Sequence, residues 1–489
     1  MKTFSYRNIL CIIYLFAYNL RLGSILSKLL NLLKSLGCNL VDILWKWRDI
    51  GRCIIGCNHI FSGCIEDGKI LSDTLELICL PIVSIYISVS GTSYHIQVNS
   101  CSIYIAYIVA LIILLIQTGG LGFMTFVSVL FGMLKRNMGL YERKAFMQSA
   151  GEWKLSGIRR LIRRIFIGTG IFEGCGAILL SIRFIPDFGA AKGIYYAVWH
   201  SVSAFCNAGF DLMGGTFGGD TFVSFTRYAA DPVVSLTLCG LIIIGGLGFC
   251  VWGDIVDSKG NVKKFSLYTK IIVLINTLML VFSTLLFFFF ERNNPTYADF
   301  SMGEKWLVSF FNATTPRTAG FNTIDLNSLS DSGYLLTIML MFIGGSSGST
   351  AGGIKISTMA VILMGMIAVF RGRKDITIGK KRVEYSLVNQ ALAIFVSCLI
   401  LVMTATLLIC AIEPDPIASF RQVLFETVSA LGTVGLSLSL TPVLSTASKL
   451  IIMLLMYAGR VGILTLALAL GESRTSSEVK KPLDTLLIG

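Results

Sequence analysis

Four short polar turns, each with a central glycine, interrupt otherwise apolar parts of this 489-residue sequence. They lie a little over one hundred residues apart and read Val89-Ser90-Gly91-Thr92, Asn207-Ala208-Gly209-Phe210, Thr318-Ala319-Gly320-Phe321 and Thr433-Val434-Gly435-Leu436. Non-helical backbone inside a membrane is tolerated only where protein or a water-filled cavity surrounds it. Four related turns at a regular interval therefore predict one shared central site that conducts or carries something small.

The glycine at the centre of each turn suits a ring of backbone carbonyl groups. Such a ring replaces the hydration shell of a cation without placing a fixed charge in lipid. Aiming consecutive carbonyls at one axis requires backbone angles that glycine adopts without steric penalty. A short helix ending at the turn would direct its partially negative C-terminal end to the same place, which also favours a cation. Glycines that merely break a helix are the alternative for a single turn, but they explain four matching turns poorly.

The composition places the turns in a bilayer. Hydrophobic residues make up 54% of the chain and charged residues 14%, which argues against a soluble globular domain. Spanning helices need about 20 apolar residues, and six segments are apolar enough to form all or part of one. These segments lie near 102–118, 232–249, 271–290, 334–345, 391–412 and 449–471.

Each repeat is expected to fold as a helix, a half-helix, the glycine turn and a second helix. The expected first helices are 165–184, 271–290 and 391–412; the half-helices are 195–205, 304–313 and 417–431; the second helices begin near Pro232, Leu335 and Lys449. The half-helices are too short to cross a bilayer and return, so they should be re-entrant. The predicted fold class is an all-α integral membrane protein with four repeated helix, re-entrant pore loop and helix units around a pseudo-fourfold pore.

The repeats set the expected domain boundaries. Residues 1–70 form an atypical N-terminal region with a possible first membrane helix. The pore units follow at 71–150, 151–265, 266–385 and 386–489, the third with a Gly/Ser-rich loop and the fourth with the C-terminal tail.

The formal charge of +13 could indicate nucleic-acid binding, but the positions of the charges indicate membrane topology instead. Basic residues gather at 135–164, 259–270 and 371–382, each after the second helix of a unit, as expected of cytoplasmic loops. The opposite loops are richer in acids, which would raise the local concentration of an entering cation. For any single charge, a role in topology alone is an equally good explanation.

The thirteen cysteines do not indicate a disulfide framework, because several lie within apolar segments where cysteine acts as a small hydrophobic residue. Cys53, Cys57, His59 and Cys64 are of metal-binding types, but they lack the paired short spacings of a zinc module. Incidental cysteine usage is the favoured interpretation.

The turns and their neighbouring motifs resemble those of the Trk/Ktr/HKT superfamily of potassium transporters. The turns after Asn207, Thr318 and Thr433 are similar to its second, third and fourth filter loops. Gln117-Thr118-Gly119-Gly120-Leu121-Gly122-Phe123 and Gly245-Gly246-Leu247-Gly248-Phe249 are similar to its second-helix motifs, and the run from Gly344 to Lys355 resembles its third-unit gating loop. The resemblance covers about 103–471. Within the superfamily, the chain resembles the bacterial Ktr-type membrane subunit most, because of the segment Tyr457–Gly462 and because no fused nucleotide-binding domain is expected.

The resemblance implies potassium uptake across the cytoplasmic (inner) membrane by a multi-pass chain. Potassium is the implied substrate, sodium a possible activator, and no nucleotide is expected on this chain. The implied partners are membrane lipid, a second copy of the chain in a homodimer, and a cytosolic ring of nucleotide-binding regulatory subunits; no nucleic acid is expected. Gly91 in the first turn favours potassium, since serine there is associated with sodium transport in some plant members. The implied filter residues are Val89, Ser90, Gly91, Asn207, Ala208, Gly209, Thr318, Ala319, Gly320, Thr433, Val434 and Gly435.

The Gly/Ser-rich loop of the third unit is interpreted as a movable obstruction below the filter. It misses a phosphate-binding loop, because Ile354 separates the last glycine from Lys355. Small residues within a helix allow unwinding, although a passive kink for close helix packing is the alternative. Arg460, a charge inside an apolar helix, should face a cavity or a partner: either this loop or a buried acid such as Glu173. The predicted gating residues are Ser346, Ser347, Gly348, Ser349, Gly352, Gly353, Lys355 and Arg460.

The first hundred residues depart from the superfamily pattern. Where its members carry a strongly apolar helix, this chain has Trp45-Lys46-Trp47-Arg48 and a cysteine-rich stretch. Divergence explains this, and so does a frameshift restored near Ser102.

Three functional classes follow from the sequence. A gated pore for potassium uptake leads; a sodium- or proton-coupled secondary transporter that alternates access around an ion site is the second. A membrane enzyme is the weakest, because His59, His95 and His200 form no catalytic pattern with neighbouring acids.

Overall fold

The chain divides into two compact units, Met1–Leu80 and Pro81–Gly489. The computed structural model describes much of the second unit: residues 102–121, 158–214, 216, 223–373, 376–378, 381–414 and 418–462. The predicted first turn with Val89, Ser90 and Gly91 lies outside the described residues, as do the cysteine-rich stretch and most of the basic segment 135–164.

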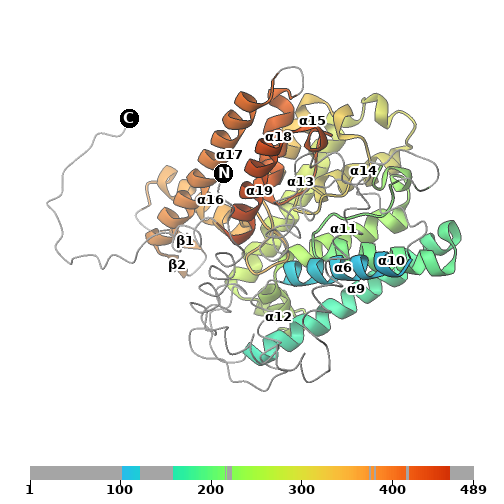
Figure 1. The fold of residues 1–489 in the computed structure, drawn as a ribbon. Coiled ribbons are helices and arrows are strands. Elements are labelled where there is room, and N and C mark those ends of the chain that lie inside the picture. Colours follow the sequence, from blue (N-terminus) through green and yellow to red (C-terminus); the bar gives the residue numbers. More distant parts are fainter. Residues whose placement is uncertain are drawn as a thin grey trace, which may run out of the picture. The chain divides into compact units, whose positions relative to one another are not determined.

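The second pore unit has the predicted order of helix, half-helix, turn and helix (Figure 1). Helix α6 (Ser102–Leu121), which precedes this unit, packs against its half-helix. The elements of the unit are, in chain order, α9 (Ile158–Phe188), α10 (Ala190–Phe205), η2 (Thr226–Tyr228), α11 (Pro232–Leu247) and α12 (Phe249–Asp257).

The third and fourth pore units repeat this order, each with a short 3-10 helix between the turn and the second helix. After η3 (Val262–Lys264), the third unit contains α13 (Leu267–Glu291), η4 (Pro295–Tyr297), α14 (Met302–Thr314), η5 (Leu326–Ser328), α15 (Asp331–Phe342) and α16 (Ile356–Phe370). The fourth contains α17 (Tyr385–Ile412), α18 (Phe420–Gly432), η6 (Thr441–Val443) and α19 (Thr446–Val461).

Two of the half-helices, α14 and α18, begin where serine caps them. At α14, the Ser301 hydroxyl accepts a hydrogen bond from the backbone N–H of Glu304, and the Glu304 carboxylate accepts one from the backbone N–H of Ser301. Ser419 and Gln422 form the same capping box at α18. The prediction that the fourth half-helix begins at 417 is therefore wrong by three residues, because the cap fixes its start at Phe420.

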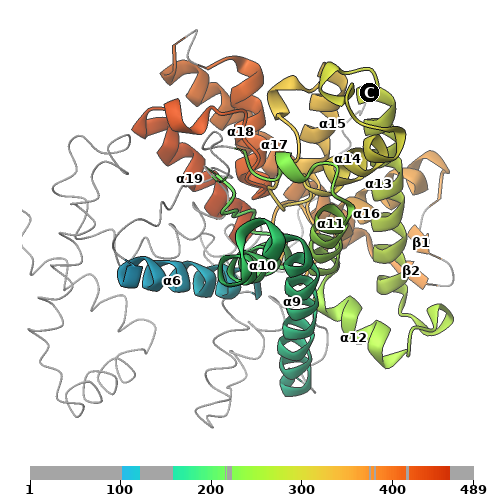
Figure 2. The same cartoon turned by 90° about the vertical axis from the view of Figure 1, so that its right-hand side faces the viewer.

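Three described helices are long and apolar enough to cross a bilayer: the part of α9 from Arg163 to Phe188, α13 and α17. The pair α11 and α12 would make a fourth, but the chain bends by 91° between them (Figure 2). The predicted apolar segment near 232–249 is helical over α11, which ends at Leu247, just before the bend. Gly248 has φ 96°, and the next N–H, of Phe249, donates to the carbonyl of Gly348 at 2.8 Å instead of continuing the helix.

The residues that the structure describes are helical, as predicted, apart from a short pair of strands near the basic segment 371–382. Strands β1 (Ile376–Ile378) and β2 (Lys381–Val383) pair antiparallel, with Ile376 opposite Val383. The sequence agrees with this pairing, since Ile376, Thr377 and Ile378 are all β-branched.

A repeated polar link joins the first and second helices of the third and fourth units. The Glu291 carboxylate at the end of α13 accepts a 3.1 Å hydrogen bond from the backbone N–H of Ser330, the N-cap of α15. The Glu413 carboxylate after α17 likewise accepts one at 2.9 Å from Ser445, the N-cap of α19. The link fixes the outer helices that surround each half-helix.

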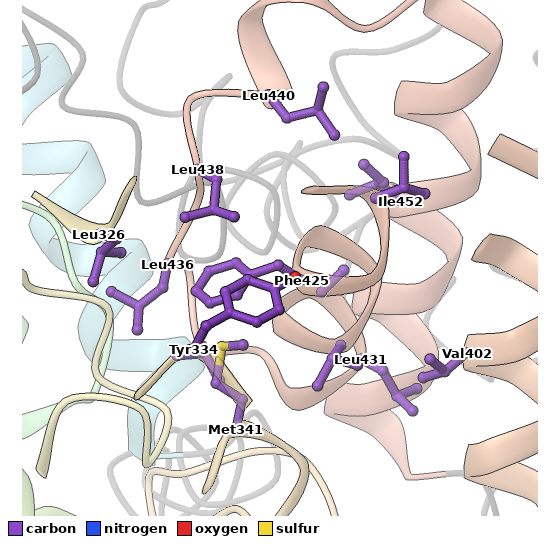
Figure 3. Packing of buried hydrophobic residues seen from close by; sticks show 14 of the residues in the cluster. Leu326, Tyr334, Met341, Val402, Phe425, Leu431, Leu436, Leu438, Leu440 and Ile452 are labelled. Carbon is purple, nitrogen blue, oxygen red and sulfur yellow. The ribbon is translucent and has the colours of Figure 1, made fainter. Parts of the chain in front are cut away.

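The main buried cluster lies around the fourth half-helix and the segment that follows its turn. Figure 3 shows Leu436 and Leu438 beside the rings of Phe425 and Tyr334. The two rings stack with centroids 5.4 Å apart, which joins α18 of the fourth unit to α15 of the third. This apolar packing holds the fourth turn in place.

Candidate functional site

The three described glycine turns share one backbone conformation. In each, the first polar residue and the glycine both have positive φ: 52° and 74° at Asn207 and Gly209, 70° and 89° at Thr318 and Gly320, and 52° and 90° at Thr433 and Gly435. Such angles are uncommon for threonine and asparagine and readily adopted by glycine. Three turns with the same costly backbone are built for one geometry.

The hydrogen bonds that close the turns also repeat. In the second unit, the N–H of Ala208 donates to the carbonyl of Ser203 at 2.9 Å. In the fourth, the N–H of Val434 donates to the carbonyl of Ser429, also at 2.9 Å. The third turn differs slightly, because Ala319 bonds to Thr315 at 3.0 Å, one residue nearer. In all three, the end of the half-helix holds the turn directly.

The three turns meet at one place. A side chain at Gly209 would collide with the carbonyl oxygen of Ala319, and a side chain at Gly320 with the carbonyl oxygen of Val434. Each of these glycines therefore lies against a carbonyl group of the next unit. The close approach and the positive φ both require glycine, and together they bring carbonyls from distant parts of the chain to one centre.

The half-helices point their C-terminal ends at this centre. Helices α10, α14 and α18 have 16, 13 and 13 residues and end at Phe205, Thr314 and Gly432, shortly before their turns. At 1.5 Å per residue they are roughly 20–24 Å long, shorter than the ~30 Å hydrocarbon core. They are re-entrant, as predicted, and their terminal carbonyl dipoles add negative potential at the turns.

In the second unit, the residue seven positions before the turn, His200, supports the segment that follows the turn. His200 is fully buried, with its Nδ1 2.7 Å from the carbonyl oxygen of Tyr196. Its Nε2 accepts a 3.1 Å hydrogen bond from the backbone N–H of Leu212, just beyond the turn. Both ring nitrogens are thus occupied, and His200, set aside in the sequence as non-catalytic, ties the half-helix to the chain that leaves the turn.

Glu426 occupies the same position in the fourth unit, and Phe311 in the third. The Glu426 side chain is buried, and its Oε1 accepts a hydrogen bond from the Thr441 hydroxyl. Its Oε2 has no hydrogen-bond partner among the residues that the structure describes. Glu426 was not among the residues predicted from the sequence; the polar residue at matching positions of α10 and α18 was the available signal.

A second residue missed in the sequence is Arg317, directly before the third turn. Its side chain is 5% exposed and donates to the amide oxygen of Asn276 in the middle of α13. The Asn276 amide donates to the carbonyl of Ile272 at 2.9 Å, and its nitrogen lies 3.5 Å from the Ser346 hydroxyl. A buried polar chain thus runs from the third turn to the Gly/Ser-rich loop.

The Gly/Ser-rich loop between α15 and α16 is closed at its base by backbone hydrogen bonds. The Gly344 N–H donates to Ile354 at 2.9 Å, and the Ile356 N–H donates to Gly345 at 3.0 Å. Within the loop, the Ser349 hydroxyl bonds to the carbonyl of Ser346 at 2.7 Å. The segment is therefore a compact, self-bonded loop and not a simple kink in one helix.

The loop lies between the end of α11 and the fourth turn. The Ser346 N–H donates to the carbonyl of Gly246 at 3.0 Å, and the Thr350 N–H donates to that of Gly245 at 3.3 Å. The loop thus satisfies carbonyl groups at the end of α11. On its other side, a side chain at Gly352 would collide with Thr433 of the fourth turn. A glycine is required at this contact, and the loop directly adjoins the glycine-turn centre.

The other predicted gating residues lie in or beside this loop. The Ser347 hydroxyl is 2.8 Å from that of Ser357 on α16. Gly348 and Gly353 have positive φ of 65° and 64°. Lys355, the N-cap of α16, donates its Nζ back to the carbonyl of Ala351 at 2.6 Å.

Arg460 reaches the loop from α19. Its guanidinium donates to the carbonyl of Thr350 at 2.6 Å and to the carbonyl of Gly119 on α6. The alternative partner, Glu173, accepts a 3.2 Å hydrogen bond from Gln117. Of the two partners predicted from the sequence, Arg460 forms a hydrogen bond with the loop. Arg460 also bonds to α6 of the first unit.

The arrangement is that of a helical membrane protein whose re-entrant half-helices hold glycine turns around one centre. A model of the TrkH family, described as cation transport protein, matches residues 84–478. The chain therefore belongs to the TrkH family of cation transport proteins.

Several characterised proteins are similar to this chain. The Ktr system potassium uptake protein B of Bacillus subtilis (strain 168) is 39% identical over 365 residues, 74% of this chain and 79% of that protein. The potassium/sodium uptake protein NtpJ of Enterococcus hirae is 37% identical over 382 residues, 78% of this chain and 83% of that protein.

The crystal structure of the potassium transporter TrkH from Vibrio parahaemolyticus has a similar fold. It gives a TM-score of 0.60 at 16% sequence identity, covering 80% of this chain and 77% of that chain. The likeness supports the repeated pore-loop architecture.

Proposed function

We propose that this chain takes up potassium across the cytoplasmic membrane through a gated filter formed by the four glycine turns. The observation that carries the proposal is the contact of Gly209 and Gly320 with carbonyl groups of the neighbouring turns. Carbonyl oxygens gathered in this way replace the hydration of a cation. The potassium-uptake names of the relatives favour potassium. A coupled secondary transporter is the second candidate, and transport is favoured over catalysis.

The direct test is ion flux through the purified chain in liposomes, across potassium, rubidium and sodium. Gly209→Ser, Gly320→Ser and Gly435→Ser should each lower potassium uptake and its preference over sodium at least about tenfold, since a side chain displaces the carbonyls. Gly240→Ala is the matched control, because nothing lies within 4 Å of a side chain there. Unchanged kinetics for both ions in all three serine variants would overturn the filter. Flux above carrier rates would separate a pore from a carrier.

The Gly/Ser-rich loop and Arg460 form the proposed gate. The hydrogen bonds from Arg460 to Thr350 and Gly119 support a closed state in which the loop is held below the filter. Arg460→Ala and a shortened loop should both raise basal potassium flux and leave selectivity unchanged. Arg460→Lys keeps the charge with fewer donors and should give an intermediate flux. Lower or unchanged flux in folded variants would make the loop a passive element.

A cytosolic nucleotide-binding ring and a homodimer are the proposed assembly, with membrane lipid around it. The basic segments 135–164 and 371–382 offer a charged face for such a partner. Charge reversal at Arg159, Arg160, Arg163 and Arg164 should weaken co-purification of the regulatory subunit and its control of flux. Survival of both would exclude this face as the docking surface. Sodium is proposed as an activator.

A further inference from the structure

The second and fourth units treat equivalent positions of their half-helices differently. His200 in α10 has a partner at each ring nitrogen, so protein atoms alone satisfy it. Glu426 in α18 has Thr441 at one carboxylate oxygen, while Oε2 has no partner among the described residues and is closed off from solvent. The fourth unit therefore has an unused oxygen where the second unit has none.

The surroundings of Glu426 make this oxygen costly. Phe425, next to Glu426 in the chain, and Leu440, next to its partner Thr441, are apolar and almost fully buried. A carboxylate in such a place is strongly disfavoured unless a positive charge or further hydrogen bonds compensate it. A bound cation would supply the positive charge and would also coordinate the Oε2 atom that lacks a hydrogen-bond partner among the described residues.

The nearby side chains offer hard oxygen ligands. Besides the Glu426 carboxylate, there are the hydroxyl of Thr441 and the hydroxyl of Ser437, whose oxygen lies 3.3 Å from that of Thr441. Oxygen ligands select hard cations. A single carboxylate balances one positive charge, which favours a monovalent ion over calcium or magnesium. Oxygens 3.3 Å apart suit the short bonds of a small ion with few ligands, so sodium fits better than potassium.

We propose that Glu426, Ser437 and Thr441 bind a sodium ion behind the fourth turn, separate from the filter. The ion would join the half-helix to the segment that leaves the turn, as His200 does in the second unit without an ion. The sodium site stands on these contacts alone, whereas its effect on uptake rests on the proposed filter. Bound sodium would stabilise the fourth turn and thereby promote potassium uptake.

The test uses the purified full-length protein in detergent at neutral pH, with sodium replacing choline at constant ionic strength. Sodium should raise the thermal unfolding temperature of the wild type in a saturable way. Glu426→Gln keeps the shape and the acceptor for Thr441 but removes the charge, so the sodium-dependent rise should disappear. Ser437→Ala should weaken it, which keeps the proposal testable if the first variant folds poorly.

Two controls separate the site from other effects. Glu413→Gln removes another carboxylate of the same unit, one already bonded to Ser445, and should keep the sodium response. Gly209→Ser, whose side chain would meet Ala319 of the third turn and not the fourth, should remove a potassium response but keep the sodium response, so a failed filter and a failed sodium site are distinguishable. A sodium response that survives Glu426→Gln overturns the proposal. Its absence in the wild type does so too, and would assign a proton to Glu426.

Discussion

The second and fourth units close their glycine turns with matching backbone hydrogen bonds, yet the side chains behind the turns differ. Behind the second turn is the neutral ring of His200, satisfied on both sides. Behind the fourth is the carboxylate of Glu426, satisfied on one side by Thr441. Backbone geometry is therefore common to the units, whereas the chemistry that stabilises each turn belongs to one unit. A near-symmetric set of carbonyls can in this way respond to different ions or protons at each unit.

The third unit extends the comparison, since its turn depends on the buried guanidinium of Arg317. Asn276→Leu would leave that charge without its acceptor in α13, which should destabilise the protein by about 3 kcal/mol and abolish uptake. Asn276→Asp is the matched control, because a carboxylate keeps an acceptor for Arg317. The measurements are the thermal unfolding temperature in detergent and rubidium uptake. Equal stability of the two variants would mean that Arg317 does not depend on this contact.

His200→Phe places the third unit's residue in the second unit and removes both hydrogen bonds of the ring. The N–H of Leu212 then loses its acceptor, at a cost of about 1–3 kcal/mol. We expect a lower unfolding temperature and weaker discrimination between potassium and sodium, measured by unfolding and competitive uptake. Full retention of both would show that the second turn needs no support from this side chain.

Ser445→Ala removes the capping hydroxyl at the link between the outer helices, keeps the backbone N–H that bonds to Glu413, and should have the smallest effect. Loss of the N-cap of α19 costs about 1 kcal/mol and should leave ion selectivity unchanged.

Burial acts to raise the pKa of Glu413, but hydrogen bonds from Ser448 and Ser445 outweigh it and lower the pKa. The contribution of this carboxylate is therefore present above its ordinary pKa and is lost as the pH falls through the lowered value. Unfolding measured against pH should show a weaker acid dependence in Ser445→Ala.

The order of elements and three of the turns could be predicted because their signals are local. Glycine with flanking polar residues marks each described turn, and apolar runs mark the helices. The boundaries of α14 and α18 were displaced by a few residues because serine caps, not apolar periodicity, set them.

The supports behind the turns could not be predicted in the same way. The partners Arg317 and Asn276 lie 41 residues apart, and Arg460 and Thr350 lie 110 apart, so only the folded chain brings them together. The bend at Gly248 likewise depends on a carbonyl of the distant loop. Its signal was the run of glycines near the end of α11, which the sequence analysis assigned to a motif and not to a change of direction.

The position of Arg460 also has a consequence for biosynthesis. Translation delivers α6 and the Gly/Ser-rich loop well before α19, yet the carbonyls of Gly119 and Thr350 both receive hydrogen bonds from this one late residue. Chains emerge at about 5–20 residues per second, and their N-terminal parts fold first. The first three units must therefore remain in the membrane without these hydrogen bonds to the loop until α19 is synthesised. Arg460 then connects the first unit to the third.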